Sequence, residues 1–192
     1  EGMAAARALI AGADVAIFDH APGRLEALGL DAAGLTADHP ALVHAWMPPY
    51  GTTGRWSRLP AHHSLLSGLT GTAFRQGNWS DQPTHLILPV LHYAQAVMGA
   101  AAIGSALYER SRSGLGQGVV ISGLHGASEA SGVARMLGAD PIPRGTPPGA
   151  NPRYRLYQCA DGEWFFLGTL FTNFYRKAFE VLGLADVFDA LG

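Results

Sequence analysis

The sequence predicts an α/β fold: an open, parallel, Rossmann-like sheet with helices on both faces, plus the start of a smaller α+β domain. Three short apolar runs, at residues 15–18, 42–47 and 119–122, have the length and polar boundaries of buried strands. Helical segments separate these runs, and strands that alternate with helices form parallel sheets covered on both faces. A change of pattern beyond a Pro- and Gly-rich stretch indicates the second domain.

Glycine and proline mark the ends of the first helices. Gly12 ends the first of them and Gly29 the second, because glycine adopts the left-handed conformation that closes a helix. Pro22 and Gly23 open the second helix, since the missing N–H of proline would be unpaired in a first turn anyway. The helices expected in this part of the chain span residues 4–10, 24–28 and 31–38.

The middle of the chain carries two histidine-bearing segments. Residues 59–71 form a helical run with His62 and His63 near its start. Residues 88–93 place His92 at the start of a long Ala/Gly-rich helix. The uncharged part of that helix, residues 93–108, is shorter than the roughly 20 apolar residues of a membrane span, so we expect a buried core helix. Gly99 and Gly104 would let it approach other backbones closely, and a further helix is expected over residues 128–137.

Composition shifts divide the chain into domains. Residues 1–139 form the large α/β domain, residues 140–153 a Pro/Gly-rich linker, and residues 154–192 the start of the small domain. In the last part, the dipeptide Asp161-Gly162 is a strong hairpin signal, and its flanking runs, residues 154–160 and 163–168, are the expected strands. A helix over residues 173–182 follows. The abrupt termini suggest a chain that is incomplete at both ends.

Overall charge and cysteine content limit the partners. The 192 residues are 48% hydrophobic and 15% charged, which is enough apolar material for a core. A net charge of −2 gives no broad basic field, so nucleic acid is not favoured as a partner, and no membrane is expected either. Cys159 is the only cysteine, which excludes an internal disulfide and fits a reducing, cytoplasmic compartment.

The candidate site lies where the loops that follow the first two strands meet the histidines. Ligands in open α/β sheets bind beyond the carboxyl ends of the strands, and the loop over residues 48–54 is such a rim, although it also suits an ordinary connection. His62 and His92 are expected to converge beside it. Each also has a simpler interpretation: His62 as a capping or solvated residue, and His92 as a hydrogen-bonded core histidine. No Cys/His spacing typical of a zinc site occurs, so no metal is expected.

Several segments together resemble family III CoA-transferases, the carnitine dehydratase and bile-acid-inducible protein F group that includes α-methylacyl-CoA racemase. Residues 13–17 (ADVAI), Pro22-Gly23 and residues 28–30 are similar to the family pattern ADVVIE…RPG…LGL. Residues 50–54 (YGTTG) resemble its GFGQTG loop, and residues 157–162 (YQCADG) its second-domain hairpin. The resemblance covers nearly the whole chain, and full family chains are longer.

The resemblance implies the ligand and the assembly. It implies acyl-CoA or CoA as the ligand, no other cofactor, and a homodimer of the full-length protein. The family arginine that precedes Pro22, which helps to hold the CoA phosphates, is Ala21 here, and Arg24 is the nearest replacement. The residues that the resemblance implies for CoA binding are Pro22, Gly23, Arg24, Tyr50, Gly51 and His63.

The resemblance also implies the catalytic residues, with one departure. Family transferases attack the thioester with an aspartate, which is covalent catalysis by a carboxylate. Racemase members instead move the α-proton with a His/Asp pair. The racemase histidine falls on His62, while the aspartate of both classes falls on His92. Two functions remain open: an enzyme that acts on acyl-CoA thioesters by CoA transfer or α-carbon racemisation through His92 and His62, or a non-catalytic CoA-transferase-like domain, half of a tandem fusion.

Overall fold

The computed structural model describes residues 2–60, 62–75, 82–131, 149 and 151–190. The described residues group into two compact units, one within residues 1–73 and 85–139 and the other within residues 74–84 and 140–192. Most of the expected linker at 140–153 lies outside the described residues, so the domain boundaries derived from sequence stay predictions.

A parallel three-stranded sheet in the order β1-β2-β3 forms the centre of the first unit. The strands are β1 (Val15–Phe18), β2 (Val43–Trp46) and β3 (Gly118–Val120). In the parallel register, Val15 aligns with Val43 and His44 with Gly118. The predicted α/β class with a parallel sheet is therefore confirmed, with the third strand shifted slightly toward the N-terminus.

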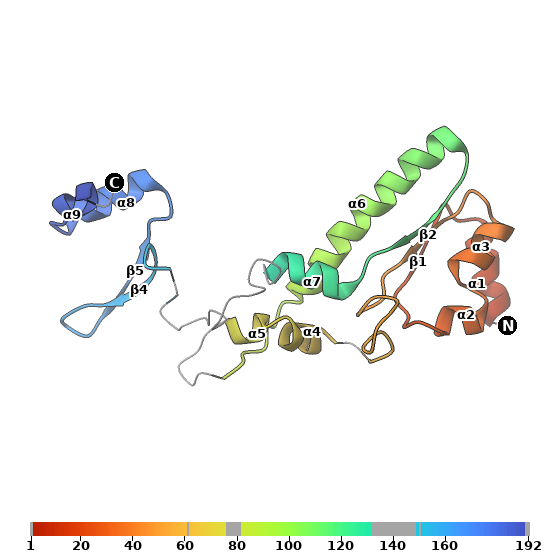
Figure 1. Cartoon of the computed structure of the whole chain (residues 1–192), viewed down its shortest axis with the longest axis horizontal. Helices are drawn as coiled ribbons and strands as arrows, with labels where there is room; N and C mark the ends of the chain where they lie inside the picture. Colours follow the sequence, from red (N-terminus) through yellow and green to blue (C-terminus); the bar gives the residue numbers. More distant parts are fainter. Residues whose placement is uncertain (1, 61, 76–81, 132–148, 150, 191–192) are drawn as a thin grey trace. The chain divides into compact units, whose positions relative to one another are not determined.

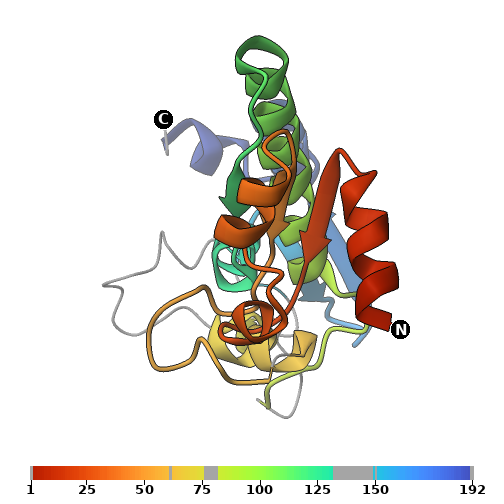
Figure 2. The same cartoon turned by 90° about the vertical axis from the view of Figure 1, so that its right-hand side faces the viewer.

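Three short helices, α1 (Gly2–Ala11), α2 (Arg24–Leu28) and α3 (Ala32–Asp38), lie on one side of the sheet, and α6 (Val90–Ser113) lies on the other (Figure 1 and Figure 2). Gly29 ends α2 at φ 62°, as glycine at that position predicts. The expected place of Pro22 in the first turn is wrong, because Gly23 is the N-cap at φ 86° and the helix begins at Arg24.

The first hydrophobic core fills the space between the sheet and the three short helices. Leu25 and Leu35 are each 1% exposed, because both helices turn their apolar face toward the strands. The Asp31 carboxylate caps α3 by accepting the N–H of Gly34 at 3.0 Å. The buried members of this core are Ile10, Ala16, Leu25, Leu30, Leu35 and Leu42.

Helix α6 is longer than the sequence predicted. Its 24 residues begin at Val90 and end at Ser113, where Gly114 at φ 76° closes the helix. By length and composition alone it could cross a membrane, so the expectation that it is too short is wrong. Only 22% of its most apolar window is buried, so the expected buried core helix is also wrong, although one face packs on α7 (Gly123–Ser131), β2 and β3.

Arg110 in the last turn of α6 joins segments that are distant in the sequence. Its guanidinium donates to the backbone carbonyls of Asp14 at 3.3 Å and Ala41 at 3.1 Å. It also pairs with the Asp14 carboxylate at 2.9 Å. These contacts fasten the end of α6 to the segments that precede β1 and β2.

Helix α7 begins five residues before the predicted start at residue 128, and residues 132–137 of that expected helix lie outside the described residues. The Ser122 hydroxyl accepts the N–H of His125 at 3.0 Å, as a capping side chain does. The carbonyls of Pro48 and Pro49 accept the N–H groups of Gly123 and Leu124 at 2.9 and 2.8 Å. The loop after β2 therefore sets the start of α7, and a sequence pattern does not show that contact.

The second unit contains an antiparallel hairpin and two helices. The strands are β4 (Tyr154–Gln158) and β5 (Trp164–Gly168), and Gly162 adopts φ 90° in the predicted turn. Helix α8 (Thr172–Val181) lies where a helix was expected, and α9 (Ala185–Ala190), which was not expected, follows Gly183.

Gly126 of α7 approaches the backbone of α6 closely, whereas one of the glycines predicted to provide such a contact does not. A Cβ at Gly126 would lie 2.7 Å from the backbone nitrogen of Gln95, whereas a Cβ at Gly104 meets nothing within 4 Å among the described residues. Gly99 approaches the side chain of Met47 rather than a backbone. The contact between α6 and α7 therefore depends on Gly126.

We expect Gly126→Ala to lower the free energy of unfolding by about 1–3 kcal/mol, because the methyl group must push two helix backbones apart. The matched change Gly104→Ala should instead raise it by about 0.5–1 kcal/mol, since alanine is the better helix former at an open position. Urea denaturation of both variants measures the difference. Equal effects of the two substitutions would contradict the packing described here.

Candidate functional site

Three segments of the first unit meet around a small apolar cluster. Leu66 of α4 (His63–Leu69), Leu91 of α6 and Ala127 of α7 are at most 1% exposed, and Tyr50 from the loop after β2 packs against them. Leu66 lies one turn beyond the start of α4, and Leu91 directly precedes His92. This packing therefore fixes the N-terminal ends of α4 and α6 close together, and each end carries a histidine.

The histidine that contacts His92 is His63. Their ring centroids are 5.6 Å apart, and the ring centroid of His85 lies 6.0 Å from that of His63. His62 lies one residue earlier, exposed, as the N-cap of α4 with extended backbone at φ −132°. The expected convergence of His62 with His92 stays a prediction, while α4 and α6 themselves are in contact.

His63 is half-buried, and both of its ring nitrogens are shielded from water. Among the residues that the structure describes, neither nitrogen has a hydrogen-bond partner of good geometry. Burial lowers the pKa of His63, and repulsion from His92 and then from His85 lowers it further, with a weaker opposing effect from the backbone of Leu88. His63 is therefore a neutral imidazole at neutral pH.

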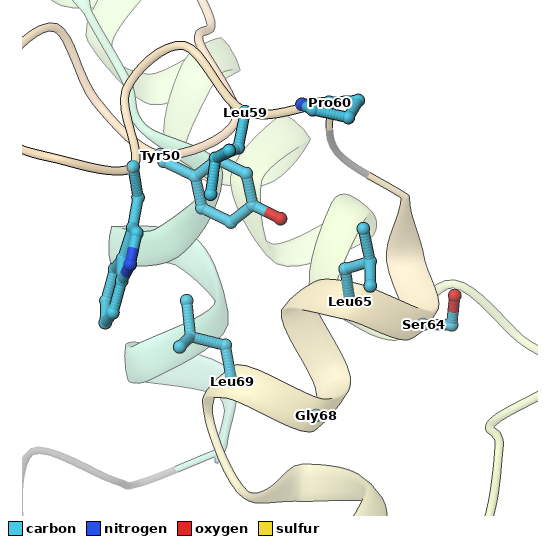
Figure 3. Close-up of a pocket in the computed structure, with 8 residues that line it drawn as sticks. Tyr50, Leu59, Pro60, Ser64, Leu65, Gly68 and Leu69 are labelled. Atoms are coloured by element: carbon cyan, nitrogen blue, oxygen red, sulfur yellow. The ribbon is translucent and has the colours of Figure 1, made fainter.

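An apolar pocket of about 470 Å³ lies beside α4, the helix that begins at His63. Figure 3 shows Tyr50 projecting from its loop toward α4, where Leu65 and Leu69 face it. Burial raises the pKa of Tyr50, so its hydroxyl stays protonated and can donate a hydrogen bond. The eight lining residues carry no charge: Tyr50, Trp56, Leu59, Pro60, Ser64, Leu65, Gly68 and Leu69.

The side chain of Arg58 lies next to Gly23, one of the residues that the resemblance implies for CoA binding. We call this turn, residues 22–24, the Gly23 corner. The guanidinium Nη2 of Arg58 is 3.8 Å from where a Cβ of Gly23 would be. Arg24 is exposed at the first position of α2, and the N–H of Gly23 donates to the Glu26 carboxylate at 2.8 Å. Arg58 therefore lies at the Gly23 corner, next to Ala21, which stands at the position of the family arginine. The spacing of residues in the sequence did not predict this position of Arg58.

The remaining predicted residues belong to the loop after β2. Gly51 adopts φ 84° and approaches the Cβ of Ser122, the residue that caps α7. Tyr50 and Gly51 therefore lie between the apolar pocket and α7. Within the part of the chain that the structure describes, no group of three His, Cys, Asp or Glu side chains is arranged to hold a metal ion.

Comparison with known proteins identifies sequence relatives. A model described as CoA-transferase family III matches residues 1–191. α-Methylacyl-CoA racemase of Mus musculus is 30% identical over 192 residues, which cover 96% of this chain and 50% of the mouse protein. Succinate–glutarate CoA-transferase of Agrobacterium fabrum is 27% identical over 194 residues, which cover 98% of this chain and 48% of that protein. The chain spans about half the length of the curated relatives it matches.

Solved structures share the fold. A CaiB/BaiF family protein from Brucella suis superposes with a TM-score of 0.71 at 24% identity, over 96% of this chain and 50% of that one. Rv3272 from M. tuberculosis superposes with a TM-score of 0.77 at 19% identity, over 96% and 49% of the two chains. These likenesses support the fold alone.

The lowered pKa of His63 predicts a loss of stability in acid. Between that lowered pKa and the ordinary value of about 6.5, the unfolded chain binds more protons than the folded chain. The stabilisation is therefore complete above about pH 6.5 and is lost as the pH falls through the pKa of folded His63. We expect His63→Gln to flatten this fall, measured as urea midpoints across the pH range.

The matched control is His125→Gln, because the His125 side chain is 60% exposed and lies on α7. This variant should keep the pH dependence of the parent. A parent-like slope in His63→Gln would contradict the burial of a neutral imidazole.

Proposed function

Because the chain belongs to CoA-transferase family III, we propose that the full-length protein acts on acyl-CoA thioesters by exchanging the proton of the α-carbon, as in racemisation. The supporting observation is the imidazole of His92, which lies against a second, neutral imidazole at a ring distance of 5.6 Å. Imidazoles accept and donate protons near neutral pH, and exchange of the α-proton needs groups that do both.

The proposed reaction uses His92 and His62 as the acid/base pair. One imidazole takes the α-proton, the thioester enolate forms, and the conjugate acid of the other imidazole returns a proton to the opposite face. The enolate oxygen needs a hydrogen-bond donor. At the start of α6, the N–H groups of Val90 and His92 already donate to the carbonyls of Leu88 and Pro89, which favours the Gly51 turn as that donor.

CoA transfer is the less favoured activity for this domain. The transferase reaction passes through an anhydride formed by a carboxylate nucleophile, and His92 has no carboxylate. The second candidate is a non-catalytic domain in a tandem fusion whose other half keeps the aspartate. A full-length sequence with a second, aspartate-bearing copy would favour that candidate.

The apolar pocket supports an apolar acyl group as the substrate class. Its volume of about 470 Å³ is in the range of small-molecule sites, which are usually lined by apolar side chains. Ser64, which lines it, directly follows His63 in α4. A dicarboxylic acyl group such as succinyl would place its free carboxylate among uncharged side chains, at a desolvation cost.

The CoA phosphates are proposed to bind at the Gly23 corner. Arg58 and Arg24 supply positive charge there, while Pro22 and Gly23 shape the turn. Guanidinium groups form strong, charge-assisted hydrogen bonds to phosphate. Tyr50, Gly51 and His63 complete the CoA-binding set that the family resemblance implies.

The assembly and location of the protein are also proposals. Tyr93, Val97 and Tyr108 expose 59%, 71% and 66% of their surface along α6, and such a stripe is suited to burial in a homodimer of the full-length protein. The exposed thiol of Cys159 fits a cytoplasmic location. Neither nucleic acid nor a membrane is proposed as a partner.

Deuterium exchange tests the proposed reaction. The full-length protein should incorporate deuterium at the α-carbon of an apolar 2-methylacyl-CoA in D₂O. His92→Ala should lower the rate by about 100-fold or more, because general acid/base groups contribute at least that much. His92→Asp is the second variant. No exchange in the parent, with CoA transfer gained in His92→Asp, would indicate a silenced transferase; robust transfer that survives His92→Ala would refute the proposed role of His92.

Calorimetric titration tests the phosphate site. Arg58→Ala should weaken CoA binding by about 10- to 100-fold, since hydrogen bonds to charged groups contribute roughly 1.5–3 kcal/mol. Arg112→Ala is the matched control, because Arg112 is an exposed arginine at the opposite end of α6 from His92. Parent-like affinity in Arg58→Ala would exclude Arg58 from the CoA site.

A further inference from the structure

We propose that His92, His63 and His85 form a proton relay that carries the substrate-derived proton between the site and solvent. The inference rests on the proposed function for the source of the proton, and on the arrangement of three rings for its route. The ring centroids of His92 and His63 are 5.6 Å apart, and those of His63 and His85 are 6.0 Å apart. His63 is thus the middle member.

The three rings differ in their access to water. His92 is half-buried in the first turn of α6, both ring nitrogens of His63 are inaccessible, and His85 is exposed. An imidazole with shielded nitrogens, in contact with a half-buried ring and an exposed ring, is the arrangement that a relay requires. His85 precedes α6 in the sequence and gives the route an end in water.

Among the described residues, the two ring nitrogens of His63 have no well-formed hydrogen bond, and the Leu88 backbone has only a weak effect on the ring. Burying a polar group without a hydrogen bond is costly, so such groups usually have a function or a transient partner. A neutral imidazole has one donor nitrogen and one acceptor nitrogen, and therefore can accept a proton on one side while it releases one on the other. The χ2 torsion of histidine has a broad range of favourable angles. Small rotations about it, or one bridging water, would connect rings at these separations.

The relay step conserves atoms and charge. His92 takes the α-proton on one ring nitrogen and releases the proton of its other nitrogen to His63. His63 passes its own proton to His85, which releases it to water, and the three rings return to neutral forms with exchanged tautomers. The conjugate acid of His62 supplies the proton that the enolate receives on its opposite face, and the relay works in reverse when the reaction runs in the other direction.

Within the part of the chain that the structure describes, few titratable groups surround His63. Those that face it are His92 on α6 and His85 before it, and both lower its pKa. Tyr50 packs against Leu66, Leu91 and Ala127, and its hydroxyl is protonated. Helix α7, which also contacts α4, carries His125 and Glu129, which pair with each other at 3.9 Å.

Nuclear magnetic resonance of the full-length protein labelled with ¹³C-histidine tests the coupling without any substrate. The His63 resonance should titrate below the ordinary histidine value of about 6.5 and should move upward in both His92→Gln and His85→Gln. His125→Gln should leave it unchanged. A His63 titration that is the same in the parent, His92→Gln and His85→Gln would overturn the relay.

Kinetics with an apolar 2-methylacyl-CoA in D₂O tests the transfer itself. His63→Gln and His85→Gln should each lower the maximal exchange rate about tenfold or more, with little change in KM for His85→Gln. Added imidazole should restore the rate, because a diffusible base replaces a missing shuttle. Parent-like rates in both variants, or losses that imidazole does not restore, would overturn the relay. If the parent shows no exchange, the proposed function is refuted instead. The resonance titrations then decide whether the titration of His63 depends on His92 and His85.

Discussion

The packing of Leu66, Leu91 and Ala127 with Tyr50 determines the geometry of the candidate site. These side chains come from three helices and from the loop after β2, and their burial excludes water from the point where the helices meet. Because Leu91 immediately precedes His92, and Leu66 follows His63 by one helical turn, the apolar contact and the imidazole contact are adjacent parts of one interface. Displacement of either helix would separate the rings.

Local rules predicted most of the fold. Short apolar runs located the three parallel strands, and glycine at residues 29 and 162 predicted a helix end and a hairpin turn, because both positions require positive φ. The sequence failed where distant groups decide the outcome. Helix α7 begins at Gly123 because the carbonyls of Pro48 and Pro49 accept its first N–H groups. That contact joins segments far apart in the chain, and no periodicity reveals it.

The site was predictable only in part, for a related physical reason. The sequence identified His62, His63 and His92 as a group, but which neighbour contacts His92 depends on the residue at which α4 begins. With His62 as the N-cap, His63 becomes the first helical residue and packs among the other rings. Arg58 was missed because its approach to Gly23 follows from the path of an irregular loop rather than from any spacing.

The contacts of Arg110 have a consequence for the order in which the protein assembles during synthesis. The ribosome releases β1 and β2 early, but the third strand and the arginine that binds the carbonyls of Asp14 and Ala41 emerge much later. Until then, one side of β2 has no neighbouring strand, and the segments that precede β1 and β2 lack their hydrogen bonds to Arg110. A nascent chain that stalls between these points exposes an open strand edge, which is a template for association with other chains.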